Sequence, residues 1–211
     1  MKNAPIVPDA WLYLFILGTI TVVTFIFYSY LALIPLILFL FIGFFFRNPQ
    51  RKIPEQPALI ISPADGLVMS VETVKEERYL HSEAIKVSIF LNIFNVHVNR
   101  APIAGKVEYQ EYRSGKFLPA YKSEAAAVNE QNLLGLKNND FKVLVIQIAG
   151  LVARRVVSWV KPGDFLEQGE RFGLIKFGSC TELYLPLKVK IEVKKGDRVR
   201  GGETIIGRVI G

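Results

Sequence analysis

The sequence predicts a mostly β fold, a barrel or sandwich, preceded by an N-terminal hydrophobic helical hairpin. Three features predict it: a long uncharged segment near the N-terminus, short apolar runs with strand-like alternation after it, and a repeated glycine-containing pattern near the C-terminus. Short strands separated by frequent turn residues are typical of barrels and sandwiches, whereas βαβ units alternate strands with helical segments.

The uncharged segment covers residues 11–46. One membrane-spanning helix needs about 20 apolar residues, so this segment is too long for one span and slightly short for two. Tyr28, Ser29 and Tyr30, together with Pro35, provide a place for the chain to turn. We therefore expect two short helices in a tight hairpin that either crosses the bilayer or enters one leaflet. A signal peptide is the main alternative, but its apolar core is only about 7–15 residues long.

The positive charge of the chain indicates on which side of the membrane the β-rich part lies. The composition is 51% hydrophobic, yet the net charge is +7, and Arg47, Arg51 and Lys52 directly follow the uncharged segment. Basic flanks favour the cytoplasmic side of a membrane, so we expect the β domain on the cytoplasmic face of the cell membrane. The charge suits an anionic membrane surface. No recognised nucleic-acid motif is present, and nucleic acid is not an expected partner.

The polar, proline-rich stretch 47–57 marks the boundary between an anchoring segment, 1–52, and a β-rich domain, 53–211. Apolar runs that suit strands follow at 59–74, 85–100, 105–113, 142–150, 153–160 and 182–193. Only residues 121–133 (YKSEAAAVNEQNL) are predicted as a helix or a long loop.

An internal repeat joins residues 160–178 to residues 193–211. In each copy a Gly-Asp turn is followed by a second glycine and a glutamate: Gly163-Asp164 with Gly169-Glu170, and Gly196-Asp197 with Gly202-Glu203. Glycine supplies the positive φ that tight hairpins need. The pattern resembles the hammerhead hairpins of lipoyl- and biotinyl-type domains. Those domains carry a modified lysine, usually beside methionine, and the repeat has no Met-Lys pair, so a swinging-arm carrier is not expected.

Three short stretches contain residues that could perform chemistry: SPADG (62–66), NIFNVHVNR (92–100) and KFGSC (176–180). Taken singly, Asp65 is a turn aspartate, His97 a solvated strand residue and Gly178-Ser179 a plain β-turn. Taken together, the three side chains could form a relay. The histidine would accept the serine proton, and the aspartate would orient the imidazole.

Cys180 is the only cysteine, so the chain cannot form an internal disulfide. The only histidines are His81 and His97, and we expect no Cys/His metal site. For Cys180 we favour packing against its neighbours over a catalytic thiol. His81 lies in a charged stretch and is predicted as a loop residue.

Several ordered motifs resemble one family. SPADG, FNVHVNRAP, FLPAY with NEQN, QIAGLVARR and FGSCTELYLP occur in the order found in short-chain, pyruvoyl-dependent phosphatidylserine decarboxylases. The resemblance covers most of residues 53–211, and an anchoring N-terminal segment fits it as well. Family members typically carry Gly-Ser followed by a variable residue, so Cys180 is within the pattern.

The resemblance implies that Ser179 becomes the cofactor. Its Oγ would attack the carbonyl carbon of Gly178, with His97 as the base and Asp65 orienting it. Elimination and hydrolysis would then give a β chain (1–178) and an α chain (179–211) that starts with a pyruvoyl group. The two chains would remain together as a heterodimer, and a higher oligomer is left open.

The resemblance also implies the substrate reaction. The pyruvoyl ketone would form a Schiff base with the amine of phosphatidylserine, and loss of CO2 would give phosphatidylethanolamine. No metal is required. The anchor would keep the enzyme at its lipid substrate. Arg154 and Arg155 are candidate phosphate-binding residues, although strand alternation points them to opposite faces, so at most one is expected to contact substrate.

The sequence leaves two alternatives open. A non-enzymatic, membrane-tethered hammerhead adaptor or scaffold would explain the anchor and the repeat, but not the coexistence of Asp65, His97 and Gly178-Ser179. A pyruvoyl decarboxylase that acts on a related ether-lipid serine headgroup would share the whole mechanism.

Overall fold

The computed structural model describes residues 4–54, 56, 58–115, 128–150, 155–176 and 179–210. The chain forms two compact units, Met1–Gln50 and Arg51–Gly211, which are described separately. The second unit begins at Arg51, whereas the sequence pattern placed the boundary after Lys52. Both residues are held by the β-rich unit, because Arg51 binds Asp65 and the Lys52 N–H donates to Glu203.

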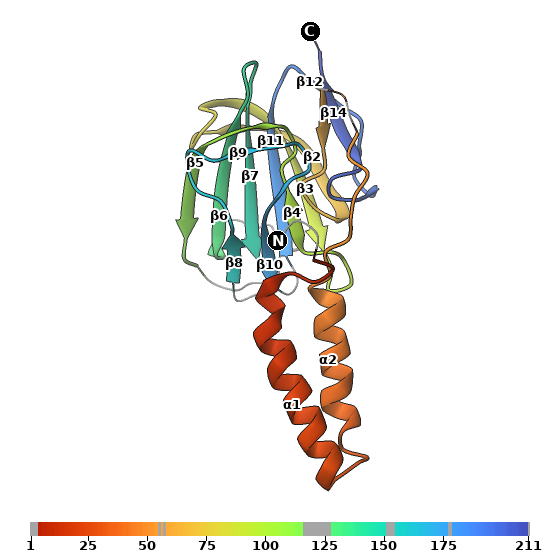
Figure 1. The fold of residues 1–211 in the computed structure, drawn as a ribbon. Helices are drawn as coiled ribbons and strands as arrows, with labels where there is room; N and C mark the ends of the chain where they lie inside the picture. Colours follow the sequence, from red (N-terminus) through yellow and green to blue (C-terminus); the bar gives the residue numbers. More distant parts are fainter. Residues whose placement is uncertain are drawn as a thin grey trace. The chain divides into compact units, whose positions relative to one another are not determined.

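The first unit is a pair of apolar helices (Figure 1). It contains η1 (Pro8–Ala10), α1 (Trp11–Phe27) and α2 (Leu33–Phe45). The chain turns at residues 28–32, and Pro35 lies in the first turn of α2, where its missing N–H leaves no hydrogen bond unmade. The rings of Tyr13 and Phe46 stack with centroids 6.0 Å apart, so the start of α1 lies beside the end of α2.

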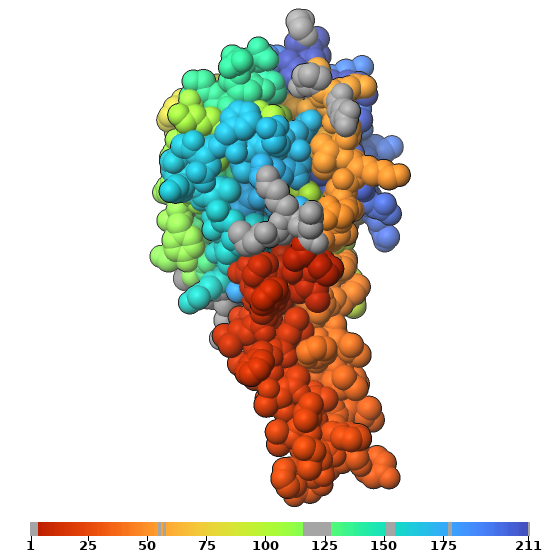
Figure 2. All heavy atoms as spheres, in the orientation of Figure 1, coloured from red at the N-terminus to blue at the C-terminus, as the bar shows by residue number. Residues whose placement is uncertain are grey.

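Figure 2 draws the atoms of both helices in red and orange, and most of their side chains are apolar and exposed. The exposed fraction is 74% for Phe15 and 63% for Ile37. Pro8–Phe27 is long and apolar enough to cross a membrane, and Leu33–Phe45 is a shorter apolar helix. This unit is therefore compatible with membrane association.

The second unit is mostly β, which confirms the predicted fold class at that level. An eight-stranded antiparallel sheet has the order β13-β2-β3-β11-β7-β6-β5-β9, and two three-stranded sheets have the orders β1-β14-β12 and β4-β10-β8. The strands are β1 (Leu59–Ile61), β2 (Gly66–Glu76), β3 (Ser82–Leu91), β4 (Val98–Arg100), β5 (Gly105–Arg113), β6 (Gln131–Lys137), β7 (Lys142–Ala149), β8 (Arg155–Ser158), β9 (Phe165–Leu166), β10 (Arg171–Lys176), β11 (Ser179–Pro186), β12 (Val189–Ile191), β13 (Arg198–Val199) and β14 (Ile205–Val209).

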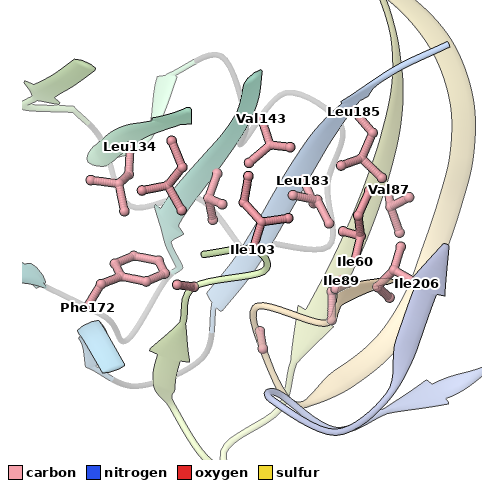
Figure 3. Close-up of a cluster of buried hydrophobic side chains, with 14 of the residues drawn as sticks. Ile60, Val87, Ile89, Ile103, Leu134, Val143, Phe172, Leu183, Leu185 and Ile206 are labelled. Carbon is pink, nitrogen blue, oxygen red and sulfur yellow. The ribbon is translucent and has the colours of Figure 1, made fainter. Parts of the chain in front are cut away.

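The main core lies on one face of the large sheet (Figure 3). Leu183 and Leu185 of β11 point into it together with Val87 of β3 and Val143 of β7. A second apolar cluster on the other face includes Cys180. Side chains alternate between faces along a strand, so β11 contributes to both clusters and is buried on both sides.

The internal repeat is visible in the backbone. Gly163, Gly169, Gly196 and Gly202 all have positive φ, between 76° and 101°, as the repeat predicted. The two copies pair with opposite edges of the large sheet: β9 extends the edge at β5, and β13 extends the edge at β2. The hydrogen bonds also correspond, because Gly163 N–H donates to the Val107 carbonyl and Gly196 N–H donates to the Val68 carbonyl, both at 2.9 Å.

The predicted helix or loop at 121–133 is wrong for its last three residues. Gln131, Asn132 and Leu133 begin strand β6, and residues 121–127 lie outside the described part of the chain. Leucine suits helices and strands alike, so the run QNLLGLK gives no clear periodicity. Packing decides the outcome, because Gly135 of β6 leaves room for the Tyr79 ring, which would lie 2.7 Å from a side-chain carbon there.

Candidate active site

Ser179 is the first residue of β11, in the middle of the large sheet. It pairs with Leu91 of β3 on one side and with Ala149 of β7 on the other. The residue is completely buried, and its Oγ has no hydrogen-bond partner among the residues that the structure describes. A buried hydroxyl without a partner is costly and rare in folded proteins. Such an atom is a candidate for chemistry, and the plain-turn interpretation does not fit Ser179 itself.

Cys180 points away from Ser179, to the opposite face of β11. It belongs to the second apolar cluster with Ile148. Burial raises the pKa of the Cys180 thiol well above its usual value, and the nearby Glu182 adds to this effect. A thiol that stays protonated is a poor nucleophile, so the structure favours packing as the role of Cys180.

A buried chain of polar side chains begins two residues after Ser179. Asn99 Nδ2 donates to Thr181 Oγ1 at 3.2 Å, and Gln147 Nε2 donates to Asn99 Oδ1 at 2.8 Å. Asn132 Nδ2 continues the chain by donating to Gln147 Oε1 at 2.9 Å. These contacts link β4, β11, β7 and β6. They hold in place the face of β11 that points toward the main core, next to Ser179.

His97 is buried, with 1% of its surface exposed, which excludes a solvated strand position. Its Nδ1 lies 3.0 Å from the Asn95 carbonyl oxygen. A carbonyl can only accept, so we assign the proton to Nδ1. In the neutral imidazole Nε2 then carries the lone pair and can act as a base.

The backbone brings His97 to the end of the sheet where Ser179 lies. The Ile175 N–H donates to the His97 carbonyl at 3.1 Å, four residues before Ser179 in the chain. The Asn99–Thr181 contact joins the same two segments again, two residues after His97 and two residues after Ser179. Gly178, between these points, lies outside the described residues.

Asp65 is held by residues other than His97. Arg51 Nη2 donates to both carboxylate oxygens at 2.9 and 2.7 Å, and the Gly201 N–H donates to Oδ1 at 2.8 Å. The described hydrogen bonds therefore do not include the Asp65–His97 bond that the motifs suggested. A guanidinium that binds a carboxylate through two hydrogen bonds is a stronger partner than a neutral imidazole. A catalytic role for Asp65 stays a prediction.

A buried arginine lies near this ion pair. Arg100 donates to the Gly169 carbonyl at 2.9 Å. Burial, with smaller contributions from Arg171 and Arg51, lowers the pKa of Arg100 to about 10. The guanidinium remains positive at neutral pH and adds to the positive potential around Asp65.

We expect the Arg51–Asp65 pair to stabilise the docking of the linker on the β unit. Both side chains are largely buried, with 9% and 13% of their surfaces exposed. Arg51→Met leaves the carboxylate without its charged partner, so the free energy of unfolding should fall by about 3 kcal/mol. Urea unfolding of the full-length, detergent-solubilised chain measures it. The control is Arg208→Met, which removes the exposed pair with Glu192 and should cost below about 1 kcal/mol. Equal losses would contradict the buried-pair role.

The arginine candidates for phosphate binding are only partly described. Arg155 is the first residue of β8 and is exposed, opposite Lys176 of β10. Arg154 lies outside the described residues. Asn99, Thr181 and Gln147 were not predicted as site residues, and the one sequence signal for them is that they are polar residues within otherwise apolar strands.

Comparison with known proteins identifies the class. Residues 38–207 match the family model described as phosphatidylserine decarboxylase. Decarboxylases are carboxy-lyases, and the match covers most of the chain. The chain belongs to the phosphatidylserine decarboxylase family.

Relatives in this family match the chain over almost its whole length. A phosphatidylserine decarboxylase proenzyme of Carboxydothermus hydrogenoformans is 56% identical over 204 residues, which are 96% of this chain and 96% of that protein. One from Symbiobacterium thermophilum is 45% identical over 99% of this chain and 98% of its own. One from Geotalea uraniireducens is 44% identical over 98% and 97%.

Proposed function

We propose that the chain is a proenzyme that cleaves itself between Gly178 and Ser179 and then converts phosphatidylserine to phosphatidylethanolamine and CO2. The family supports the reaction, and the relatives are named as proenzymes. One structural observation carries the proposal for this chain. The Ser179 hydroxyl is completely buried at the start of a central strand and has no hydrogen-bond partner among the described residues.

The maturation steps use the side chains of this chain. His97 Nε2 takes the proton of Ser179 Oγ as the oxygen attacks the carbonyl carbon of Gly178. The peptide C–N bond breaks, giving an ester and the free amine of residue 179. Loss of the Cα proton of residue 179 then breaks its Cβ–O bond and releases the Gly178 carboxylate. The remaining enamine shifts to an imine, and one water molecule replaces its nitrogen, which leaves as ammonia.

A pyruvoyl group at residue 179 fits the residues around Ser179. The surroundings there are polar, through Thr181 of β11 and Asn99 of β4, and no side-chain charge is needed to hold a group that is part of the backbone. The pyruvoyl ketone supplies a carbonyl that condenses with the substrate amine and accepts the electrons left by CO2. His97 is the candidate for holding and returning a proton in that reaction as well.

The cleaved chains should stay together. Strand β11 of the 179–211 chain pairs with β3 and with β7, both within residues 1–178. Strands β1 and β14 join the two parts a second time. The mature protein is then an α/β heterodimer, and the second copy of the repeat joins its chains as a hammerhead-like hairpin, because β13 pairs with β2.

The apolar helices and the net positive charge support a location at the membrane. The apolar helices of residues 11–45 would hold the protein at the cell membrane, with the β-rich unit on the cytoplasmic face, where a net charge of +7 suits anionic lipid. Arg154 or Arg155 would bind the substrate phosphate.

Intact mass measurement of the purified full-length protein tests self-cleavage. We expect two fragments, residues 1–178 and 179–211, the smaller blocked to N-terminal sequencing because it begins with a ketone. A stable single chain of 23.8 kDa that still decarboxylates phosphatidylserine would contradict the proposal. Product analysis with diacyl and ether-linked serine lipids then identifies the preferred lipid substrate.

A further inference from the structure

The turn between β3 and His97 exposes two large apolar side chains. The exposed fraction is 39% for Ile93 and 65% for Phe94. Among the described residues of Arg51–Gly211, they are the one pair of sequence neighbours that are both large, apolar and exposed. Adjacent exposed apolar side chains at the tip of a turn mark an interaction site more clearly than scattered ones do.

Three of the four backbone N–H groups of this turn have acceptors within the turn. The Asn95 N–H donates to the Asn92 carbonyl at 3.0 Å. The Asn95 side-chain oxygen accepts from the Asn92 N–H, and the Asn92 side-chain oxygen accepts from the Phe94 N–H, both at 2.9 Å. A polar backbone group that enters an apolar medium without a partner costs several kcal/mol. The two asparagines remove most of that obstacle, so the turn can enter the edge of a bilayer as a preformed unit.

The turn lies at the reactive end of the sheet. Strand β3 ends at Leu91, directly opposite Ser179, and the turn follows at once. Its last residue, Asn95, provides the carbonyl that accepts from His97. On the proposed function, the acyl chains of the substrate stay in the bilayer while its headgroup reaches Ser179, so a membrane-facing surface is required within a headgroup's length of that residue.

Positive charge lies at the same end. Arg155 and Lys176 are cross-strand partners, and Lys176 follows Ile175, whose N–H binds the His97 carbonyl. Cations next to exposed aromatic and aliphatic side chains suit a surface of anionic lipid headgroups over acyl chains. The proposed function requires a lipid surface at this end of the sheet, which favours a bilayer over a soluble protein partner.

We propose that the 92–95 turn inserts Ile93 and Phe94 into the lipid bilayer and thereby holds the reactive end of the β-rich unit against the membrane. The partner is the bilayer itself, at the boundary between its headgroups and acyl chains. The inference rests on the proposed function for its purpose, but the insertion is a separate physical event that can be measured without turnover.

The insertion can be measured with a fluorescent label. Phe94→Cys is labelled with a nitrobenzoxadiazole dye in the full-length Ser179→Ala chain, where the native Cys180 is buried. The matched control is Leu187→Cys, which is half exposed and directly follows Pro186, the last residue of β11. Eight residues at about 3.3 Å each place it roughly 26 Å from Ser179. Both proteins are bound to phosphatidylcholine–phosphatidylglycerol vesicles containing nitroxide-labelled acyl chains.

We expect at least twofold quenching and a blue shift for the label at position 94, and neither for the label at position 187. Flotation of both proteins with the vesicles shows that they are bound. Equal quenching at both positions, or no quenching at position 94, would overturn the insertion. Because Ser179→Ala does not turn over substrate, this result is independent of the catalytic proposal.

A second measurement connects the turn to activity. For the double variant Ile93→Ser/Phe94→Ser, we compare decarboxylation of phosphatidylserine in vesicles with that of a soluble short-chain phosphatidylserine. The ratio of the two rates should fall about tenfold relative to the unmodified protein. An unchanged ratio would show that the turn does not hold the active site against the membrane. If the unmodified protein decarboxylates neither lipid, the proposed function fails while the quenching result still decides the insertion.

Discussion

Ser179→Ala is expected to give a single chain of 23.8 kDa that releases no CO2 from phosphatidylserine. Self-cleavage needs the Oγ as nucleophile, and no other residue can provide the pyruvoyl carbonyl at that position. Denaturing electrophoresis, intact mass and CO2 release measure the result. Ser88→Ala is the matched control, because Ser88 is also a buried serine of the large sheet, on β3, with its Oγ directed to Glu182. We expect that variant to cleave normally.

The same substitution should not weaken the fold. The Ser179 hydroxyl makes no hydrogen bond to the described residues, so removing it loses no partner and relieves a desolvated polar group. Cleavage would complicate a comparison with the unmodified protein, and we therefore compare freshly purified His97→Asn, which should cleave only slowly, with His97→Asn/Ser179→Ala, which should not cleave. The free energy of unfolding should stay equal or rise by up to about 2 kcal/mol. Cleaved Ser179→Ala protein, or a clear loss of stability in the double variant, would contradict our account of this hydroxyl.

The elements that sequence predicted well are those set by local rules. Gly163 and Gly196 adopt positive φ because a tight turn before Asp requires it, whatever the rest of the fold does. The apolar segment of residues 11–46 forms helices that turn at residues 28–32, and its composition alone indicates this. Strand β6 was missed because its leucines fit a helix equally well, and only packing against Tyr79 and the neighbouring strands selects the extended form.

The contacts of Asp65 depend on long-range charge pairing, which a single sequence does not reveal. Asp65 and His97 were joined by motif, yet Arg51 binds Asp65 from 14 residues earlier in the chain. Sequence had assigned Arg51 to the membrane flank, where its charge is also suitable. Burial of Asn99 and Thr181 beside Ser179 depends on which strands meet, and a single sequence does not specify that. Ser179 and His97 stand out in the sequence because a hydroxyl and an imidazole are distinctive reactive groups, and their catalytic roles stay predictions.

His97→Asn is expected to slow self-cleavage by about 10²- to 10⁴-fold, the usual contribution of a general base. The Asn95 carbonyl holds the Nδ1 proton and leaves Nε2 as the basic atom, and an asparagine amide cannot replace it. The chain contains only one other histidine, which provides a matched control. His81 is exposed with a φ of 53°, a conformation that asparagine tolerates, so His81→Asn should fold and cleave normally.

Two further readouts separate a base from a packing residue in the cleavage reaction. Cleavage of newly synthesised unmodified chain should slow on acidification, because a protonated imidazole cannot accept the Ser179 proton, and His97→Asn should lose that dependence. Added imidazole should restore part of the cleavage in His97→Gly, where the vacated space lies within the buried site, and should not affect Ser179→Ala. If His97→Asn matures at the rate of His81→Asn, His97 is not the base, and another group must take the proton from the buried hydroxyl.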